Sequence, residues 1–144
     1  MNGVTVVAFA LAVVFCALSL LHIGWALGFG SGRVQVVPER PDGQPVFRPG
    51  PFATLTVAGL LFLAALLVTQ RAGLGREWIP AGFVGPGCWG VSAAFVLRAI
   101  GEFRYVGVFK RVRGTAFARM DSRLYTPLAL LLGLGAGMVA LLAP

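Results

Sequence analysis

Residues 4–29, VTVVAFALAVVFCALSLLHIGWALGF, form an apolar run that contains no Asp, Glu, Lys or Arg. A helix needs about 20 apolar residues to cross a hydrocarbon core of about 30 Å, so this run is long enough to span a bilayer. A cleaved signal peptide is the alternative interpretation. The preceding Met1-Asn2-Gly3 has no positive charge, and the apolar run is longer than the core of a signal peptide. We therefore expect these residues to remain in the protein as a membrane span.

Three further apolar runs of similar character lie at about 51–70, 79–100 and 124–143. In the whole chain of 144 residues, 58% are apolar and 12% are charged, whereas an ordinary globular domain has roughly 25% charged residues. A soluble protein of this size has too small a core to bury so much apolar surface. The sequence therefore predicts an all-α fold, a single membrane domain over residues 1–144 with four transmembrane helices.

Small residues indicate where these helices approach one another. Pro86 interrupts the third run and is surrounded by four glycines, which predicts close helix contacts on both sides of the proline. Gly133 and Gly137 in the fourth run have the small-xxx-small spacing that lets two helices pack closely. Because the chain contains 20 glycines, such spacing is a weak signal by itself.

Lys and Arg are distributed unevenly among the loops that join the runs. Loops 30–50 and 101–123 carry three and six of them, whereas the 71–78 connection carries two. Cytoplasmic loops of membrane proteins are enriched in Lys and Arg. We therefore expect the protein in the inner (plasma) membrane, with loops 30–50 and 101–123 in the cytoplasm and both termini outside.

The loop before the fourth run is both basic and amphipathic. Apolar and basic residues alternate between residues 103 and 119, a pattern typical of a helix that lies on anionic lipid. Residues 110–115 offer a phosphate cradle as the alternative, but they match no P-loop spacing. We favour anchoring at the membrane interface. The basic residues assigned to this interface are Lys110, Arg111, Arg113 and Arg119.

The antiparallel order of four spans brings the end of the first, the end of the third and the start of the fourth to one membrane face. His22, Arg98, Glu102 and Asp121 lie there, and Arg98 and Glu102 are spaced to pair along one helix. Ionisable residues at membrane depth usually face a partner or a cavity. The sequence therefore predicts a polar pocket for an anionic headgroup or small solute, or for proton transfer. Its candidate ligand-binding residues are His22, Trp25, Arg98, Glu102, Arg104 and Tyr125.

A structural interpretation of these polar residues is also open. A membrane histidine often joins two helices by a hydrogen bond, Arg98 can extend to the headgroups, and Glu102 can simply neutralise it. Asp121, just before the fourth run, is expected to cap that helix. Pro127 then falls in the first turn, where a missing N–H does no harm.

Several kinds of function are not indicated. There is no HExxH, GxSxG or Cys-His metal spacing, and one histidine cannot provide bis-histidine haem ligation. Cys16 and Cys88 form no CxxC pair and are expected to be free thiols. We therefore predict no metal and no cofactor. The net charge of +7 is spread between apolar runs, which favours contact with anionic phospholipids over nucleic acid.

Four short segments carry a resemblance to a known family. They read HIGWALG at 22–28, VP at 37–38, LRAIGEFR at 97–104 and DSRLYTPL at 121–128. Over nearly its whole length, the chain resembles a family of small bacterial four-helix membrane proteins with HxxWALG and RAIGEFR motifs, classed as a domain of unknown function. The resemblance implies a membrane location and supplies no activity.

Three functions follow as hypotheses. The favoured one is a small polytopic membrane protein whose cytoplasmic polar cluster binds an anionic lipid headgroup or a small solute. The second is a membrane enzyme for a lipid-like substrate, with His22 as the acid–base group and Arg98 as an anion clamp. The third is a non-catalytic subunit whose glycine-rich faces bind a copy of itself or another membrane protein.

Overall fold

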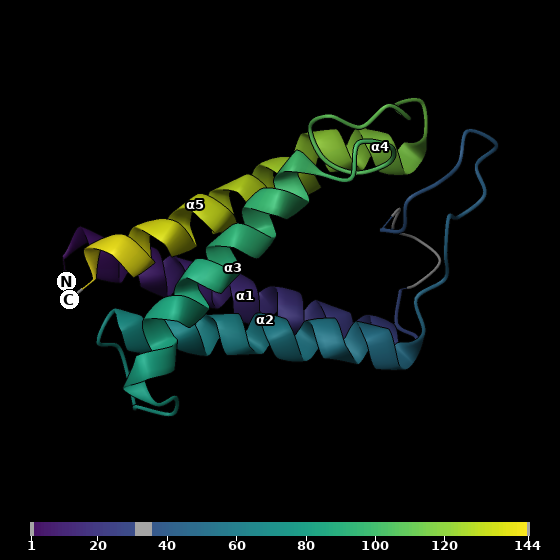
Figure 1. Cartoon of the computed structure of the whole chain (residues 1–144). Helices are drawn as coiled ribbons and strands as arrows, with labels where there is room; N and C mark the ends of the chain where they lie inside the picture. Colours follow the sequence, from purple (N-terminus) through teal and green to yellow (C-terminus); the bar gives the residue numbers. More distant parts are fainter. Residues whose placement is uncertain (1, 31–35, 144) are drawn as a thin grey trace.

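The computed structural model describes residues 2–30 and 36–143, which form a bundle of helices (Figure 1). Four helices are long and apolar enough to cross a membrane. Within these described residues the only β pairing is one isolated bridge, so the predicted all-α fold with four transmembrane helices is confirmed. The helices are α1 (Gly3–Ala26), α2 (Pro51–Arg71), α3 (Ala81–Ile100), α4 (Ala116–Met120), the π-helical turn η1 (Asp121–Tyr125) and α5 (Thr126–Leu142).

The helices form two antiparallel pairs. α1 packs along α2 and α3 packs along α5, and fewer contacts join one pair to the other. Figure 1 shows that the pairs lie close together where α1 begins and α5 ends, and that they separate toward loops 36–50 and 101–115. We call the end that carries these two loops the open end of the bundle, and the opposite end the closed end.

At the closed end, all four spans meet in an apolar core. Phe15, Val68, Cys88 and Val139, one from each span, are completely buried there. Burial from water does not hold such a core together inside lipid, because lipid is as apolar as the side chains. Close packing therefore has to fix how the two helix pairs sit together at this end.

Glycines allow α3 and α5 to approach one another. A Cβ added at Gly133 would lie 2.9 Å from the backbone nitrogen of Val96, and one at Gly137 would lie 2.9 Å from Ser92 Oγ. Ser92 Oγ also donates a hydrogen bond to Gly133 O at 2.8 Å. The predicted small-xxx-small contact is therefore confirmed for this helix pair.

The glycines around Pro86 differ from those of α5. A Cβ at Gly87 would come within 2.6 Å of the Leu67 side chain on α2, whereas the other three have nothing within 4 Å. The prediction of close contacts on both sides of the proline is wrong for these three, because only Gly87 meets a neighbouring helix. They are Gly82, Gly85 and Gly90.

The last span begins earlier than predicted. α4, η1 and α5 follow one another without a break, so one helix runs from Ala116 to Leu142. The hydroxyl of Thr115 caps it by accepting a hydrogen bond from the Ala118 N–H at 3.1 Å. The prediction that Asp121 caps this helix is wrong, because Asp121 lies inside it.

Pro127 consequently lies well inside this helix and not in its first turn. A proline in such a position removes one N–H, and its ring clashes with the carbonyl four residues back. The π-helical turn immediately precedes the proline, and its end is marked by a hydrogen bond from the Thr126 N–H to Asp121 O, five residues back. A π turn widens the helix locally, and here it accommodates Pro127.

Residues 101–115 form a compact loop of turns and bends. The predicted interfacial helix is therefore wrong for this part of the chain. α3 ends at Ile100, and the next residue, Gly101, has a φ of 88° that suits glycine alone. A Cβ at Gly101 would overlap Val106 O, and one at Gly107 would lie 2.5 Å from Ile100 O. These two glycines let the loop fold back onto the end of α3.

Candidate functional site

An open cavity of about 620 Å³ lies between the two helix pairs at the open end. Its polar wall residues are His22 from α1, Arg98 from α3 and Glu102 from the loop that follows α3. The structure thus brings together three of the six candidate residues, and we call this space the Arg98 cavity. The rest of its wall is apolar or glycine: Val36, Pro38, Phe47, Val57, Leu97, Gly101, Val106 and Phe117.

His22 is half-buried and held by its own helix. Its Nδ1 lies 2.7 Å from Leu18 O, and a carbonyl oxygen can only accept, so Nδ1 carries the hydrogen. The ring also makes an edge contact with Trp25, with 4.9 Å between centroids. The imidazole is therefore fixed through one nitrogen, and Nε2 is the atom that remains for a second partner.

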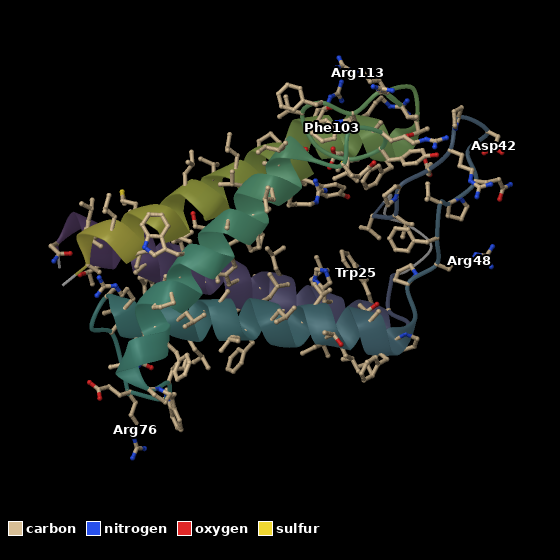
Figure 2. The ribbon with its side chains drawn as sticks, in the orientation of Figure 1. Trp25, Asp42, Arg48, Arg76, Phe103 and Arg113 are labelled. Carbon is tan, nitrogen blue, oxygen red and sulfur yellow. The ribbon has the colours of Figure 1, made fainter. Side chains whose placement is uncertain are left out.

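The other three candidate residues lie outside the Arg98 cavity. Trp25 lines a neighbouring space of about 360 Å³ beside loop 36–50, and Figure 2 shows its side chain between the two helix pairs. Arg104 lies over the Tyr105 ring at 5.2 Å and lines a separate surface depression. Tyr125 packs on the Phe117 ring, with 6.0 Å between centroids.

Arg98 is paired with Asp121 and not with Glu102. Arg98 Nη2 donates to Asp121 Oδ1 at 2.7 Å, and the Arg98 side chain is 35% exposed while that of Asp121 is completely buried. The predicted pair along α3 is wrong, because the Glu102 carboxylate accepts the N–H groups of residues 104, 105 and 106 in its own loop. Arg98 Nη1 is buried and has no hydrogen-bond partner within the described residues.

Asp121 is the centre of a buried polar cluster. Its Oδ2 accepts from the Gly107 N–H at 2.9 Å, from Lys110 Nζ at 2.9 Å and from Thr126 Oγ1 at 3.0 Å. With Arg98, Asp121 therefore has four hydrogen-bond donors. We call Asp121 together with these four donors, Arg98, Gly107, Lys110 and Thr126, the polar node. It connects α3, loop 101–115 and the last helix, and its two cations against one carboxylate leave one excess positive charge.

The basic residues assigned to the membrane interface divide into two groups. Lys110 is only 3% exposed, so its assignment to the interface is wrong: its ammonium group is enclosed by Asp121 and by Gly107 O, to which it donates at 3.0 Å. Arg111, Arg113 and Arg119 are exposed. Figure 2 shows Arg113 at the outer edge of the molecule, pointing away from the helices.

Loop 36–50 reaches across to the other helix pair. The Glu39 carboxylate accepts a hydrogen bond from the Phe117 N–H at 3.3 Å, next to the start of the last helix. A carboxylate is favourable there, because the N-terminus of a helix carries partial positive charge. Arg33, one of the three basic residues predicted in this loop, lies outside the described residues.

Sequence reasoning placed Asp121 at the correct membrane face but missed its role. One signal was available: Asp121 is the only acidic residue after Glu102, among six Lys and Arg residues between positions 103 and 123. A lone carboxylate in such a basic segment requires cationic neighbours. Which cations it meets depends on how loop 101–115 folds back, and that information is not local.

Within residues 2–30 and 36–143, no group of three or more His, Cys, Asp and Glu side chains is placed to hold a metal ion. Cys16 and Cys88 are free thiols, as predicted. The functional residues of the open end are therefore cations, one buried carboxylate and one imidazole.

These features define a class of protein: a multi-pass, four-helix membrane protein with a buried polar node and an open cavity at one end of its spans. The chain belongs to the family described as "Protein of unknown function (DUF3995)", which matches residues 15–136. The predicted membership of a family of unknown function is thereby confirmed, and the match includes all residues of the Arg98 cavity and the polar node. No curated protein and no solved structure matches the chain.

Proposed function

We propose that the protein binds a ligand with an anionic group in the Arg98 cavity. The group belongs to a lipid headgroup or to a small solute, and phosphate and carboxylate share the chemistry that recognises it. The observation that carries this proposal is the position of Arg98: its side chain lines the cavity, is 35% exposed, and has one buried guanidinium nitrogen, Nη1, without a hydrogen-bond partner within the described residues.

The environment of Arg98 suits an anion. Asp121 fixes the guanidinium through Nη2 but is itself shared with Lys110, so the node does not neutralise both cations. A buried donor without an acceptor costs about 1–3 kcal/mol, and an anion beside the Arg98 guanidinium would balance the excess positive charge of the node. His22 also lines the cavity, and its Nε2 can accept a hydrogen bond from a hydroxyl group of the ligand, because Nδ1 carries the hydrogen.

Native mass spectrometry from mild detergent tests the anion site. The wild-type protein should retain an anionic ligand, and Arg98→Ala should lose it. Arg111→Ala, which removes an exposed arginine elsewhere on loop 101–115, should retain the ligand and serves as the matched control. A ligand held equally by all three proteins, each with unchanged helix content, would exclude Arg98 as the anion contact.

The proposal also includes a location and an orientation. Residues 30–50 and 101–123 carry nine of the twelve Lys and Arg residues, which supports a cytoplasmic open end in the inner membrane, with both termini outside. A cysteine placed at Arg40 or Arg113 should be protected from an impermeant thiol reagent added outside whole cells, and one placed at Gly73 should react. The reverse labelling pattern would show that the protein has the opposite orientation in the membrane.

Catalysis on a lipid-like ligand is a second candidate function. It is supported by His22 and Arg98 both lining the cavity, with His22 Nε2 left for proton transfer. The masses of the ligands retained by wild type and by His22→Ala distinguish the two functions. Catalysis predicts a chemically altered ligand in the wild type and an unaltered one in the variant, and binding alone predicts the same mass in both.

Assembly with another membrane protein, or with a second copy, is supported by the open faces of Gly82, Gly85 and Gly90 on α3. Such small residues let another helix approach closely. Crosslinking in native membranes from a photoreactive residue at Gly85 should then trap a partner. The absence of any adduct there, with lipid adducts as the positive control, would count against this third function.

A further inference from the structure

We infer that the ligand of the Arg98 cavity is a membrane amphiphile with one anionic group, which enters sideways from the bilayer between α2 and α3. This inference rests on the proposed anion site and names the class of its ligand. It follows from three properties of the cavity: the uneven distribution of polarity in its wall, its lateral opening, and the depth of each part along the spans.

The wall is polar at three residues near the open end and apolar over the rest. Only His22, Arg98 and Glu102 carry polar side chains there, and the Glu102 carboxylate is occupied by the backbone of its own loop. A free phosphate or carboxylate ion would contact Arg98 and leave most of a space of about 620 Å³ empty. Cavities of this size hold ligands with a substantial apolar part, and the apolar wall favours such a part.

The opening of the cavity faces lipid. Val57 of α2 and Leu97 of α3 line the cavity, yet they are 42% and 64% exposed. They therefore lie at its rim, between two spans that diverge toward the open end (Figure 1). Apolar side chains exposed on membrane spans contact hydrocarbon, so an acyl chain can pass this rim without leaving the bilayer.

The opposite approach, from water, passes apolar side chains of loop 36–50, of which Phe47 is 54% exposed. Val36, Pro38 and Phe47 of loop 36–50 form the cavity wall on the side of the loops. The hydrogen bond from the Phe117 N–H to Glu39 joins this loop to the other helix pair. A soluble anion would have to pass this apolar loop, whereas an amphiphile already resides on the accessible side.

The depths of the polar and apolar parts of the cavity along the spans match the order of headgroup and acyl chain in a lipid. Arg98 lies two residues before the end of α3, about 3 Å along the helix, and His22 lies about 6 Å before the end of α1. Val57 lies about 9 Å inside α2 from its start at Pro51. The anion contact is thus nearest to the headgroup level, and the apolar rim extends deeper, toward the acyl chains.

The test uses the full chain in nanodiscs with a phosphatidic acid that carries a diazirine on its acyl chain. Adducts should concentrate on the α2 and α3 peptides around Val57 and Leu97. A phosphatidylcholine with the same diazirine, whose headgroup is zwitterionic, is the control for bulk lipid. Arg98→Ala should reduce the phosphatidic acid adducts about tenfold, the loss expected for one charge-assisted contact.

Tryptophan substitutions at the rim of the cavity distinguish entry of the ligand between α2 and α3 from general contact with lipid. Leu97→Trp should reduce the same adducts about tenfold, whereas Leu60→Trp, at a 61% exposed position of α2 outside the cavity, should leave them unchanged. Val57→Trp provides a second rim variant, in case Leu97→Trp disturbs helix packing. Thermal unfolding of each variant identifies such a disturbance.

Each alternative gives a distinct result. Displacement of the probe by glycerol phosphate as effectively as by unlabelled phosphatidic acid would overturn the amphiphile inference and leave the anion site intact. Equal labelling by the phosphatidic acid and phosphatidylcholine probes, at Leu60 as well as at the rim, would mean that the cavity contacts bulk lipid without selecting an anionic ligand. Unchanged labelling in Arg98→Ala, together with ligand retention in its native mass spectrum, would overturn both proposals.

Discussion

At the closed end of the bundle, four completely buried apolar side chains, one from each span, hold the two helix pairs together. At the open end the helix pairs separate, and the strongest interactions are polar: Asp121 accepts from two cations, a hydroxyl and a backbone N–H. The closed end is thus packed with apolar side chains, whereas the polar node holds the open end in shape without filling it. A cavity with a positioned cation remains there as a consequence.

The polar node should show the largest effect. Asp121→Ala leaves the buried Lys110 ammonium without its counter-charge, which typically costs about 3–5 kcal/mol. We expect a corresponding fall in the free energy of unfolding in detergent, together with faster hydrogen exchange across loop 101–115. Glu77→Ala, which removes an exposed carboxylate from the 72–80 connection, should change the unfolding free energy by less than about 0.5 kcal/mol.

The polar node also permits a rescue experiment. Replacing Lys110 by Met in the Asp121→Ala background removes the uncompensated charge, so the double variant should recover part of the lost unfolding free energy. Additive losses in the double variant would mean that the Lys110–Asp121 pair at 2.9 Å does not stabilise the open end.

Close packing of α3 on α5 should show the next largest effect. Gly133→Val brings a side chain against the backbone nitrogen of Val96, where even a Cβ would be only 2.9 Å away. Overpacking of this kind costs about 1–3 kcal/mol. Gly90→Val is the matched control, because a Cβ there meets nothing within 4 Å. Equal losses of stability in the two variants, measured by thermal unfolding, would show that the destabilisation comes from backbone propensity and not from packing.

The two regions also differ in how far the sequence predicts them. Each span is a local pattern of about 20 apolar residues, so all four could be predicted, as could the close approach at Gly133 and Gly137. The Arg98–Asp121 pair joins residues 23 positions apart, and no local pattern encodes it. Glu102 was the plausible local partner of Arg98. Glu102 does not pair with Arg98 because α3 ends at Ile100 and the Glu102 carboxylate turns to the N–H groups of its own loop.

The side-chain hydrogen bonds between spans should contribute less than either packing or charge. Ser92 Oγ donates to Gly133 O in the α3–α5 pair, and Ser19 Oγ donates to Ala58 O in the α1–α2 pair, both at 2.8 Å. Interhelical hydrogen bonds in membranes are worth about 0.6 kcal/mol on average. Ser92→Ala and Ser19→Ala should each lower the unfolding free energy by about that amount. A loss of several kcal/mol in either would contradict a bundle held mainly by packing.

The smallest effect is expected where loop 36–50 meets the last helix. Glu39→Gln keeps an acceptor for the Phe117 N–H but removes the charge at the helix N-terminus, an interaction worth about 0.3–1 kcal/mol. Hydrogen exchange at the Phe117 amide should therefore quicken modestly, while the α1–α2 core is unaffected. Asp42→Asn alters another carboxylate of the same loop, one that accepts from Gln44 N–H within the loop, and should leave the Phe117 amide unchanged. If both variants quicken its exchange equally, the loop is held by its general fold and not by Glu39, and the open end depends on the polar node alone.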